Sequence, residues 1–496
     1  MRLKFRLLLL AVTILTLVVR FTFPVTAQQS PTGSIKGTVT DQQGAVISDA
    51  TVTVTNKATG DTRKTNTGDD GIYLVSTLPP GEYEVRIESP NFSTYLITVT
   101  VQVGLTVDGD ATMRVGKPDE IVEVVSEASI INKEAHNVQG VINREKIDAL
   151  PLNGRNFLQL ALLEPGVSVS VSNAGDANNL FNVSIGGAPS SLTRITVDGG
   201  SVLDYVTGGA AQNFSTETIQ EFQISTFNFD LSTGVTSVGA VNIVSRQGGN
   251  EFHGNAFAFW RDDAFAAVPT LIPSDLDFSR YQYGGSFGGP IKKDRAFFYT
   301  NVEWLDQEAA VATVPTGPFF QQFNNISTSP YDGVVFNARG DFRLSDQHNL
   351  FTRYSYDDND AFAPVNTNTP PSYWRINANR SHNAQAGVTS TLTQTLVNDF
   401  RFNYQRIRND SLLPEESDCP ASNVGCLGRG GVQIRFVNSN LRLGNNENAP
   451  QQRILDRYQF SDNVNWQKGA HRIRFGGEWE HDYGKGFWAF AEPAVI

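Results

Sequence analysis

Hydrophobic and polar residues alternate one by one through much of the second half of this chain. In the segment 333–344, the apolar Phe336 and Phe342 lie at even positions, whereas the polar Asn337 and Arg339 lie at odd positions. Successive side chains of a β-strand point to opposite faces, so this pattern predicts a strand with one apolar and one polar face. The alternation by itself also fits a half-buried strand of a soluble sheet.

Strand length and the alternation of short and long connections distinguish a transmembrane barrel from a soluble sheet. Nine strands are predicted, at residues 252–261, 281–287, 296–306, 333–344, 349–356, 382–392, 396–407, 453–466 and 471–483. Most approach the roughly 9–11 residues that a tilted strand needs to cross a bilayer. Short turns alternate strictly with long polar connections, which is typical of a bacterial outer-membrane barrel. We therefore predict an antiparallel transmembrane β-barrel.

Aromatic residues near the strand ends are expected to form the interfacial girdles of this barrel. They are Trp260, Tyr299, Trp304, Tyr354, Tyr356, Trp466 and Trp479. Nine strands are fewer than the about 22 that surround a plug in plugged transporters. An open barrel edge in lipid leaves backbone groups unpaired at several kcal/mol each. The sequence is therefore expected to hold an incomplete barrel, cut short at Ile496.

The N-terminus predicts an export signal. Basic residues at positions 2, 4 and 6 precede an apolar run at 7–19, and Val25-Thr-Ala27 precedes Gln28 as a small-residue cleavage site. These three parts in this order are typical of a secretory signal peptide at 1–27, with cleavage between Ala27 and Gln28. A retained anchor is the alternative, but the run is shorter than the roughly 20 residues of a spanning helix.

Two further units lie between the signal and the barrel. Residues 28–116 contain short alternating segments separated by turns, and the corner Pro79-Pro-Gly81 precedes another such segment, which predicts a compact β-sandwich. Residues 117–250 predict a mixed unit, with helices at 141–150 and 157–163 followed by short strands that end at glycines. The barrel follows at 251–496, so the fold class is mainly β: a sandwich, a mixed α/β unit and a partial barrel.

Composition and short motifs exclude several classes of function. The net charge of -12 without a concentrated basic face argues against nucleic acid as a partner. The run Gly284-Gly-Ser-Phe-Gly288 matches a nucleophile elbow, but no helix follows it. Acidic residues at 357–360 lack the spacing of a calcium loop. We expect no catalytic residue, metal ligand or cofactor, and no enzymatic activity.

The chain contains two cysteines, Cys419 and Cys426, which lie close together in a segment rich in glycine and proline. Two cysteines alone are too few for a four-ligand zinc site. A local disulfide is the favoured interpretation for an exported protein, and a pair of free thiols is the alternative.

The first unit resembles the carboxypeptidase regulatory-like domain. The likeness rests on Gly33-Ser-Ile-Lys-Gly-Thr-Val-Thr-Asp, Ala50-Thr-Val-Thr-Val and Leu78-Pro-Pro-Gly-Glu-Tyr. No zinc-binding pair of histidine and glutamate accompanies these motifs, so the resemblance implies an accessory module rather than a peptidase. Related sandwiches bind sugars, which leaves a secreted carbohydrate-binding protein as one alternative for the whole chain.

The middle unit resembles the plug domain of TonB-dependent receptors of the Oar-like group, in which a regulatory-like domain precedes the plug. The likeness rests on the order of the run 150–157, Val197-Asp-Gly199, Ile219-Gln-Glu-Phe222 and the run 239–245. The run Gly288-Gly-Pro-Ile-Lys-Lys-Asp-Arg-Ala-Phe-Phe also resembles the barrel of that group. The candidate plug residues are Leu150, Pro151, Leu152, Asn153, Gly154, Arg155, Asn156, Phe157, Asp198 and Gly199.

The resemblance implies a role for the segment just after the first unit. In receptors of this kind that segment is the TonB box, an extended strand that adds to a sheet of a TonB-type energy-transducing protein. The candidate residues are Asp119, Glu120, Ile121, Val122, Glu123, Val124 and Val125. An ordinary connecting strand is the alternative.

The resemblance also implies energy-coupled import across the outer membrane. An extracellular ligand, such as a carbohydrate or a peptide, is expected to bind the outer loops and the plug, and a pull on the TonB box to displace the plug. The expected partners are outer-membrane lipid, a TonB-type protein and this ligand, with the sandwich in the periplasm. A passive outer-membrane structural protein or adhesin, built on the same barrel, is the second alternative.

Overall fold

The computed structural model describes most of the chain after the N-terminal segment. The described residues are 31–116, 121–125, 138–150, 152–171, 181–227, 234, 236–265, 276–314, 318–364, 369–436, 441–468 and 471–489. The predicted signal peptide, with Ala27 and Gln28, lies outside the described residues. Asp119, Glu120 and Pro151 also lie outside them.

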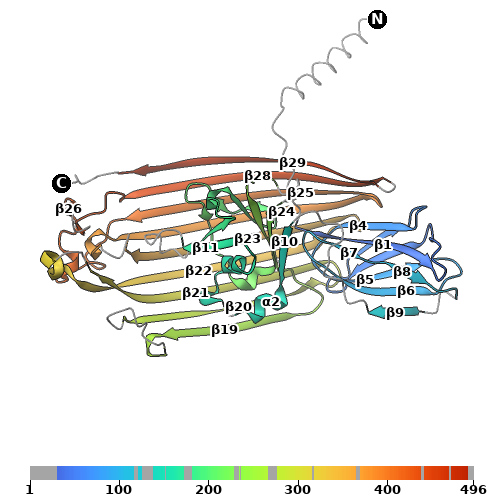
Figure 1. The fold of residues 1–496 in the computed structure, drawn as a ribbon, viewed down its shortest axis with the longest axis horizontal. Helices are drawn as coiled ribbons and strands as arrows, with labels where there is room; N and C mark the ends of the chain where they lie inside the picture. The colour runs from blue at the N-terminus through green and yellow to red at the C-terminus, as the bar shows by residue number, and fades with distance from the viewer. Residues whose placement is uncertain are drawn as a thin grey trace, which may run out of the picture.

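The first folded unit is a β-sandwich at one end of the molecule (Figure 1). One sheet has the order β4–β1–β7, with β8 also paired to β1, and the other has the order β3–β2–β5–β6–β9. Alternate residues such as Val52, Val54 and Val85 are fully buried between the sheets. The strands are β1 (Gly33–Asp41), β2 (Thr51–Asn56), β3 (Thr62–Asn66), β4 (Ile72–Leu78), β5 (Gly81–Glu88), β6 (Thr94–Val101), β7 (Thr106–Asp108), β8 (Ala111–Met113) and β9 (Ile121–Val125).

The second unit, which we call the plug, is built on a sheet of order β10–β17–β18–β13–β14. Its strands are β10 (Val138–Asn143), β11 (Val167–Val171), β12 (Phe181–Ile185), β13 (Thr193–Val197), β14 (Gly200–Ser201), β15 (Leu203–Asp204), β16 (Gly209–Ala210), β17 (Ile219–Phe227) and β18 (Gly239–Ser245). Its helices are α2 (Arg144–Ala149) and the 3₁₀ turns η1 (Asn153–Arg155), η2 (Phe157–Leu163), η3 (Ser190–Leu192) and η4 (Thr216–Thr218).

The helix predicted at 141–150 is only partly present, and its first residues were assigned wrongly. Val141 and Ile142 lie in β10 and pair with Gln223 and Phe222 of β17, so sheet pairing overrides the local helical spacing. The helix α2 begins after Asn143, whose side chain accepts a hydrogen bond from the Lys146 backbone N–H as an N-cap. The second predicted helix is present as the 3₁₀ segment η2.

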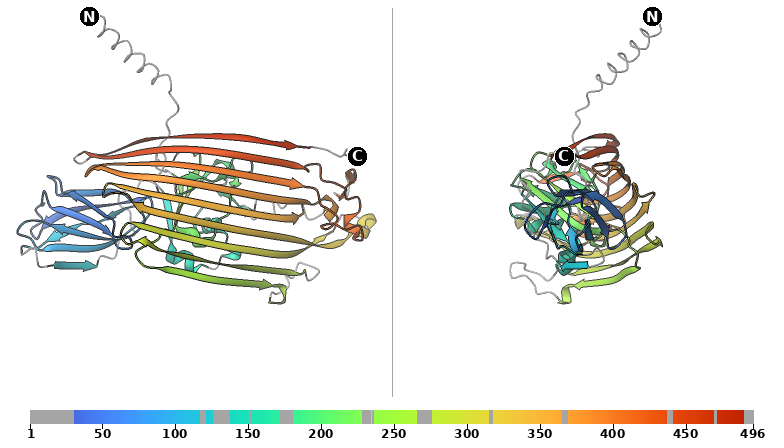
Figure 2. Two further views of the ribbon diagram at one scale, coloured as in Figure 1. Left: turned by 180° about the vertical axis from the view of Figure 1, so that it is seen from behind. Right: turned by 90° about the vertical axis from the view of Figure 1, so that its right-hand side faces the viewer.

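The third unit is a nine-stranded antiparallel sheet in which every strand pairs with its neighbours in sequence order. Viewed end-on, this sheet curves around the plug (Figure 2). Its strands are β19 (His253–Asp262), β20 (Phe278–Lys292), β21 (Ala296–Thr313), β22 (Asn325–Arg343), β23 (His348–Ala363), β24 (Arg375–Thr393), β25 (Leu396–Leu412), β28 (Gln451–Lys468) and β29 (His471–Trp488). The prediction of nine barrel strands is therefore confirmed.

Most of these strands are longer than the sequence pattern suggested, and the extra residues lie mostly at the end with the long connections. For example, β22 begins at Asn325, which pairs with Thr313 of β21, eight positions before the predicted start at 333. Backbone pairing needs no apolar face, so a strand continues through polar residues where the alternation disappears. We call this end the long-loop end and the other the short-turn end.

The buried face of this sheet is polar and its exposed face is apolar, which is the reverse of a sheet in a soluble protein. Buried positions are polar, as at Asn337, Asn383 and Gln405, whereas Trp304 and Phe400 are 41% exposed. A soluble sheet buries its apolar face, so this reversal is the arrangement of a barrel with lipid outside and a polar interior. One girdle assignment was wrong: Tyr299 is fully buried on the inner face, where its hydroxyl donates to the Glu217 backbone oxygen at 2.7 Å.

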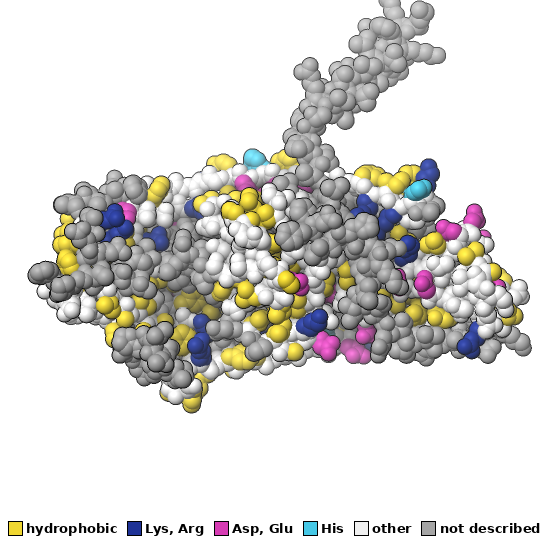
Figure 3. All heavy atoms as spheres, in the orientation of Figure 1, with side chains coloured by type: hydrophobic (Ala, Val, Ile, Leu, Met, Phe, Trp, Pro, Cys, Tyr) yellow, Lys and Arg dark blue, Asp and Glu magenta, His cyan; other side chains and the backbone are white. Residues whose placement is uncertain are grey.

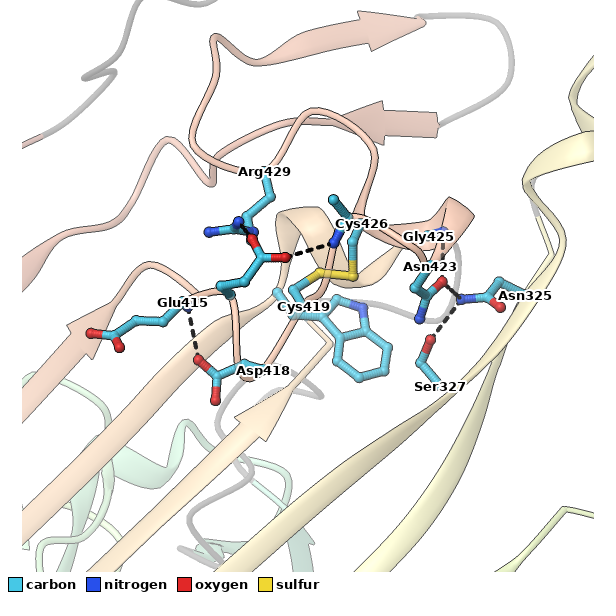
Figure 4. The surroundings of a disulfide bond; sticks show 12 residues. Asn325, Ser327, Glu415, Asp418, Cys419, Asn423, Gly425, Cys426 and Arg429 are labelled. Carbon is cyan, nitrogen blue, oxygen red and sulfur yellow. Dashed lines mark hydrogen bonds and ion pairs between the residues drawn. A yellow bond between two sulfur atoms is a disulfide. The ribbon is translucent and has the colours of Figure 1, made fainter.

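The connections at the long-loop end form a small cap. It contains the turns η7 (Pro318–Phe323), η8 (Pro371–Tyr373) and η9 (Val424–Cys426) and the hairpin of β26 (Ile434–Phe436) and β27 (Leu441–Leu443), whereas the turn η6 (Asp263–Phe265) lies in the connection between β19 and β20. A disulfide joins Cys419 to Cys426 (Figure 4). Both cysteines belong to a buried hydrophobic cluster with Trp374. No helix within the described residues is long and apolar enough to cross a membrane.

Candidate functional site

The turn between β13 and β14 places the predicted Asp198 and Gly199 at the tip of a plug hairpin. Both residues have positive φ, 49° and 84°, and Val197 pairs with Gly200, so the loop has two residues. Such a tight hairpin needs two left-handed positions, which Asp-Gly supplies at low steric cost. The hairpin tip lies against the inner face of the barrel.

Four consecutive barrel strands contact this tip. Arg353 of β23 lies 2.9 Å from one carboxylate oxygen of Asp198, and Arg339 of β22 lies 3.4 Å from the other. The backbone oxygen of Asp198 accepts hydrogen bonds from Gln385 of β24 and Arg401 of β25, both at 2.7 Å. One plug residue is thus held by β22, β23, β24 and β25 together.

The Asp198 carboxylate is almost completely buried, at 2% exposure. Burial raises its pKa, but Arg353, Arg339 and the hydrogen bonds from Ser245 outweigh burial, so the pKa lies below the ordinary value. Ser245 donates from its backbone N–H at 2.9 Å and from its hydroxyl at 2.6 Å. The carboxylate therefore stays charged and binds the arginines as a fixed anion.

A second charged cluster is centred on Glu217 of η4. Arg155 of the plug lies 2.8 Å from its carboxylate, and Arg246 lies 3.4 Å from it. Asn255 of β19 donates to the same carboxylate at 2.8 Å. The plug thus presents a second buried acid, only 3% exposed, to the barrel wall.

Arg155 links this cluster to the barrel through its flat guanidinium. The group lies 4.2 Å from the ring centroid of Phe257 and 3.8 Å from the Glu303 carboxylate of β21. Stacking on an aromatic face while pairing with two acids uses the planar geometry that lysine lacks. Arg155 itself has φ of 51°, next to Gly154 at 68°, so this turn also uses left-handed backbone.

The other plug residues predicted from the motif at 150–157 serve mainly the plug core. Phe157 and Leu158 are buried, and the Phe157 ring packs edge-on against Phe214 at 5.6 Å. Asn156 caps η2 by accepting from the Leu158 backbone N–H, and Leu150 and Leu152 pack at the edge of the core. The structure therefore brings Arg155 and Asp198 to the wall and leaves most of the motif inside the plug.

A third set of contacts fixes the plug to the last two strands. Arg194 of β13 pairs with Glu478 of β29 at 2.9 Å, and Arg453 of β28 donates to Asp204. Arg457, also on β28, donates to the Leu203 backbone oxygen at 2.9 Å. The plug is therefore attached to the barrel by buried charges at three separated places.

Several of these residues were not identified from the sequence. Glu217, Arg353 and Arg457 carry no motif, and only their positions on a polar strand face or beside the 219–222 motif single them out. Their partners lie far away in the chain, so the pairing is visible only in the folded protein. Among the described residues, no group of three or more His, Cys, Asp or Glu is arranged to hold a metal ion.

The described part of the TonB box candidate forms the edge strand β9. It runs parallel to β6, with Thr94 opposite Ile121 and Thr98 opposite Val125. β9 ends the five-stranded sheet of the sandwich, so its other edge is unpaired within the described strands. The segment is thus an extended strand, as expected, but one of its edges is already occupied.

Two known protein families match this chain, one in the barrel and one in the sandwich. The family described as "Outer membrane beta barrel domain" matches residues 244–335 and 315–491. The chain belongs to this outer-membrane β-barrel family. A second family, "Carboxypeptidase regulatory-like domain", matches residues 34–114 and covers the sandwich of this barrel protein.

Two individual proteins extend the comparison. The TonB-dependent transporter Oar of Myxococcus xanthus is 28% identical over an alignment of 284 residues that covers 54% of this barrel protein and 26% of Oar. The outer membrane transporter YddB from Escherichia coli has a similar fold, with a TM-score of 0.53 and 12% identity over 70% of this chain and 48% of YddB. The chain thus matches less than half the length of either relative.

Proposed function

We propose that this chain serves energy-coupled import through the outer membrane, with the plug as the gate. The observation that carries the proposal is the plug itself: a unit with its own hydrophobic core, fixed inside a polar barrel wall by buried charges at Asp198, Glu217 and Asp204. A passive barrel has no need of an inner unit with its own hydrophobic core. The similarity to Oar, a TonB-dependent transporter, supports the same function.

In this proposal the short-turn end faces the periplasm and the long-loop end faces outward. Residues 1–27 are the signal peptide, 28–116 the periplasmic sandwich, 117–250 the TonB box and plug, and 251–496 the barrel, although the TonB box strand β9 also pairs with the sandwich sheet. The ligand, a carbohydrate or a peptide, binds at the long-loop end and on the outward side of the plug. The partners are outer-membrane lipid and a TonB-type protein.

The free edge of β9 supports the assignment of Asp119–Val125 as the TonB box. An unpaired strand edge offers backbone N–H and C=O groups to an incoming strand. Recognition of this kind depends on the backbone, so it tolerates changes of side chain and fails when a backbone N–H is removed. Proline removes that donor, whereas alanine keeps it.

The test compares Val122→Pro with the matched control Val122→Ala in the full protein. Detergent-solubilised membranes are passed over an immobilised periplasmic domain of a TonB-type protein, and the retained barrel protein is quantified. We expect Val122→Ala to be retained like the unmodified chain and Val122→Pro to lose at least about tenfold in retention, a difference of about 1.4 kcal/mol.

Equal retention of both variants, at equal abundance in the outer membrane, would contradict the TonB box assignment. Absence of retention for the unmodified chain would instead favour the passive structural protein or adhesin. Recovery of the protein in a soluble extracellular pool would favour the secreted sugar-binding alternative.

A further inference from the structure

The sandwich covers the short-turn end of the barrel and touches three of its hairpins directly. Asn349 of β23 donates to the Asp61 carboxylate at 3.1 Å, and Arg63 donates to the Thr391 hydroxyl of β24. On the far side, Asn465 of β28 donates to the Thr77 hydroxyl at 3.2 Å. Lys and Arg side chains are gathered where the sandwich meets the barrel (Figure 3).

The sandwich also contacts the plug, from the short-turn end of the barrel. The backbone N–H of Val103 donates to the Glu221 carboxylate of β17 at 2.7 Å. Gln139 of β10 donates to the Gly104 backbone oxygen at 3.3 Å. One loop of the sandwich, between β6 and β7, therefore contacts the two plug strands β17 and β10, while other parts of it contact the barrel rim.

These contacts are polar, and the hydrophobic cores of the two units are separate. Among the described residues, the core of the plug is formed by the range 142–243 and the core of the sandwich by the range 35–113. A cavity of about 120 Å³ lies between the sandwich, the plug and the barrel. Polar and loosely packed interfaces within a chain are those that allow domain motion.

The ion pair that joins the sandwich to the barrel is more exposed than the pair that joins the plug to the barrel. The pair between Arg343 and Asp61 has side chains 22% and 24% exposed, whereas the pair between Arg353 and Asp198 has side chains 0% and 2% exposed. Water weakens a partly exposed ion pair, whereas separating a buried pair leaves two charges without a partner. The ion pair between the sandwich and the barrel is therefore easier to separate than the pair between the plug and the barrel.

We propose that the sandwich is a second, detachable gate below the plug, and that it must leave the barrel mouth before the plug can open. The handle for its removal is β9, which belongs to the sandwich sheet and precedes the plug in the chain. This inference rests on the proposed transport function. It adds an order of events: the sandwich undocks first, and the plug moves second.

The experiment measures docking in whole cells with a thiol crosslinker. Thr77→Cys and Asn465→Cys are combined in the full protein, and a short bis-maleimide is added with and without a protonophore that abolishes the proton gradient. The native Cys419 and Cys426 are joined in a disulfide and do not react. A matched control pairs Thr77→Cys with Thr328→Cys, which lies on β22 toward the long-loop end.

We expect efficient crosslinking of the Thr77 and Asn465 pair in de-energised cells and none for the control pair. In energised cells the yield falls at least about threefold, and Val122→Pro restores it. A second pair, Asp61→Cys with Asn349→Cys, reports on the same interface should the first fail to assemble. Absence of crosslinking for both assembled pairs overturns docking, and a yield independent of energisation overturns detachment.

The two proposals can fail separately. Retention by the TonB-type domain together with a constant crosslinking yield overturns only the second gate. If the unmodified chain is not retained by the TonB-type domain and crosslinking is efficient in every condition, the transport mechanism is overturned. The sandwich is then a static part of the structure.

Discussion

The carboxylate of Asp198 and the guanidinium of Arg353 lie 2.9 Å apart at the centre of the plug–barrel contact, and both side chains are almost fully buried. Asp198 comes from a plug hairpin and Arg353 from the barrel strand β23. A buried ion pair of this kind gains little over an apolar contact, but losing one partner leaves an uncompensated charge. It therefore fixes the plug at one position in the barrel.

Asp198→Asn is expected to loosen the plug by about 3–5 kcal/mol, because Arg353 and Arg339 lose their shared counter-charge. Limited proteolysis of the plug in outer-membrane fractions measures this, with cleavage becoming much faster in the variant. Asp346→Asn is the control, since the Asp346 side chain is 94% exposed and pairs with Arg343 at the surface. Equal protection of the plug in Asp198→Asn would show that this pair does not hold it.

Arg155→Lys is expected to behave almost like Arg155→Ala. Lysine keeps the positive charge but loses the flat stacking on Phe257 and the second contact, to Glu303, so roughly 1–2 kcal/mol of plug attachment is lost. The same proteolysis assay, run on both variants, tests the idea. Protection that is normal in the lysine variant and lost in the alanine variant would indicate that charge alone matters.

Docking of the sandwich is expected to weaken as pH rises through neutrality. Burial raises the pKa of Glu221 from 4.5 to about 7, although the hydrogen bond from the Val103 N–H lowers it. We expect undocking to remove Val103 and admit water to this carboxylate, which returns its pKa toward 4.5, so the docked form holds a proton that the undocked form releases. The contribution of Glu221 to docking is then fully present below 4.5 and is lost as pH passes about 7. Crosslinking of the Thr77 and Asn465 cysteine pair in isolated membranes should fall between about pH 5 and about pH 8.

Glu221→Gln provides the control for this pH effect. Glutamine keeps an oxygen that accepts from the Val103 N–H but has no titrating proton. Its crosslinking yield should be flat across the same range. A pH profile identical to that of the unmodified protein would exclude Glu221 as the responsible group.

Replacing Cys419 and Cys426 by serine is expected to loosen the cap locally by about 2–3 kcal/mol. The disulfide (Figure 4) closes a loop whose cysteines pack with Trp374, and the barrel strands β25 and β28 pair with each other without its help. Protease added to intact cells should therefore cleave the segment between these strands faster in the variant. The amount of assembled barrel should not change, and a loss of barrel would contradict a purely local role.

Much of the fold follows from the sequence because its cause is local. A period of two fixes both the strand and the face of each side chain, so the nine strands and the polar inner positions of Asn337 and Arg339 could be predicted from residues alone. The turn at Asp198-Gly199 also has a local cause, because a two-residue hairpin loop needs left-handed backbone and Asp-Gly adopts it readily.

Tertiary structure decided what the local pattern left open. Val141 and Ile142 have helical spacing but join a sheet, because β17 offers them partners across the plug. Tyr299 has the character of a girdle residue but faces inward, because its register on β21 places it opposite the Glu217 carbonyl. In both cases the energy of pairing with a distant segment outweighs a local preference.

Most of the candidate site was also decided by tertiary structure. The sequence alone supplied Asp198, Arg155 and the extended segment at 119–125, but it did not supply Arg353, Glu217 or the contact of Glu221 with Val103. Those residues acquire a role only when the plug, the barrel and the sandwich enclose them, since burial away from water turns a weak surface charge into a strong constraint.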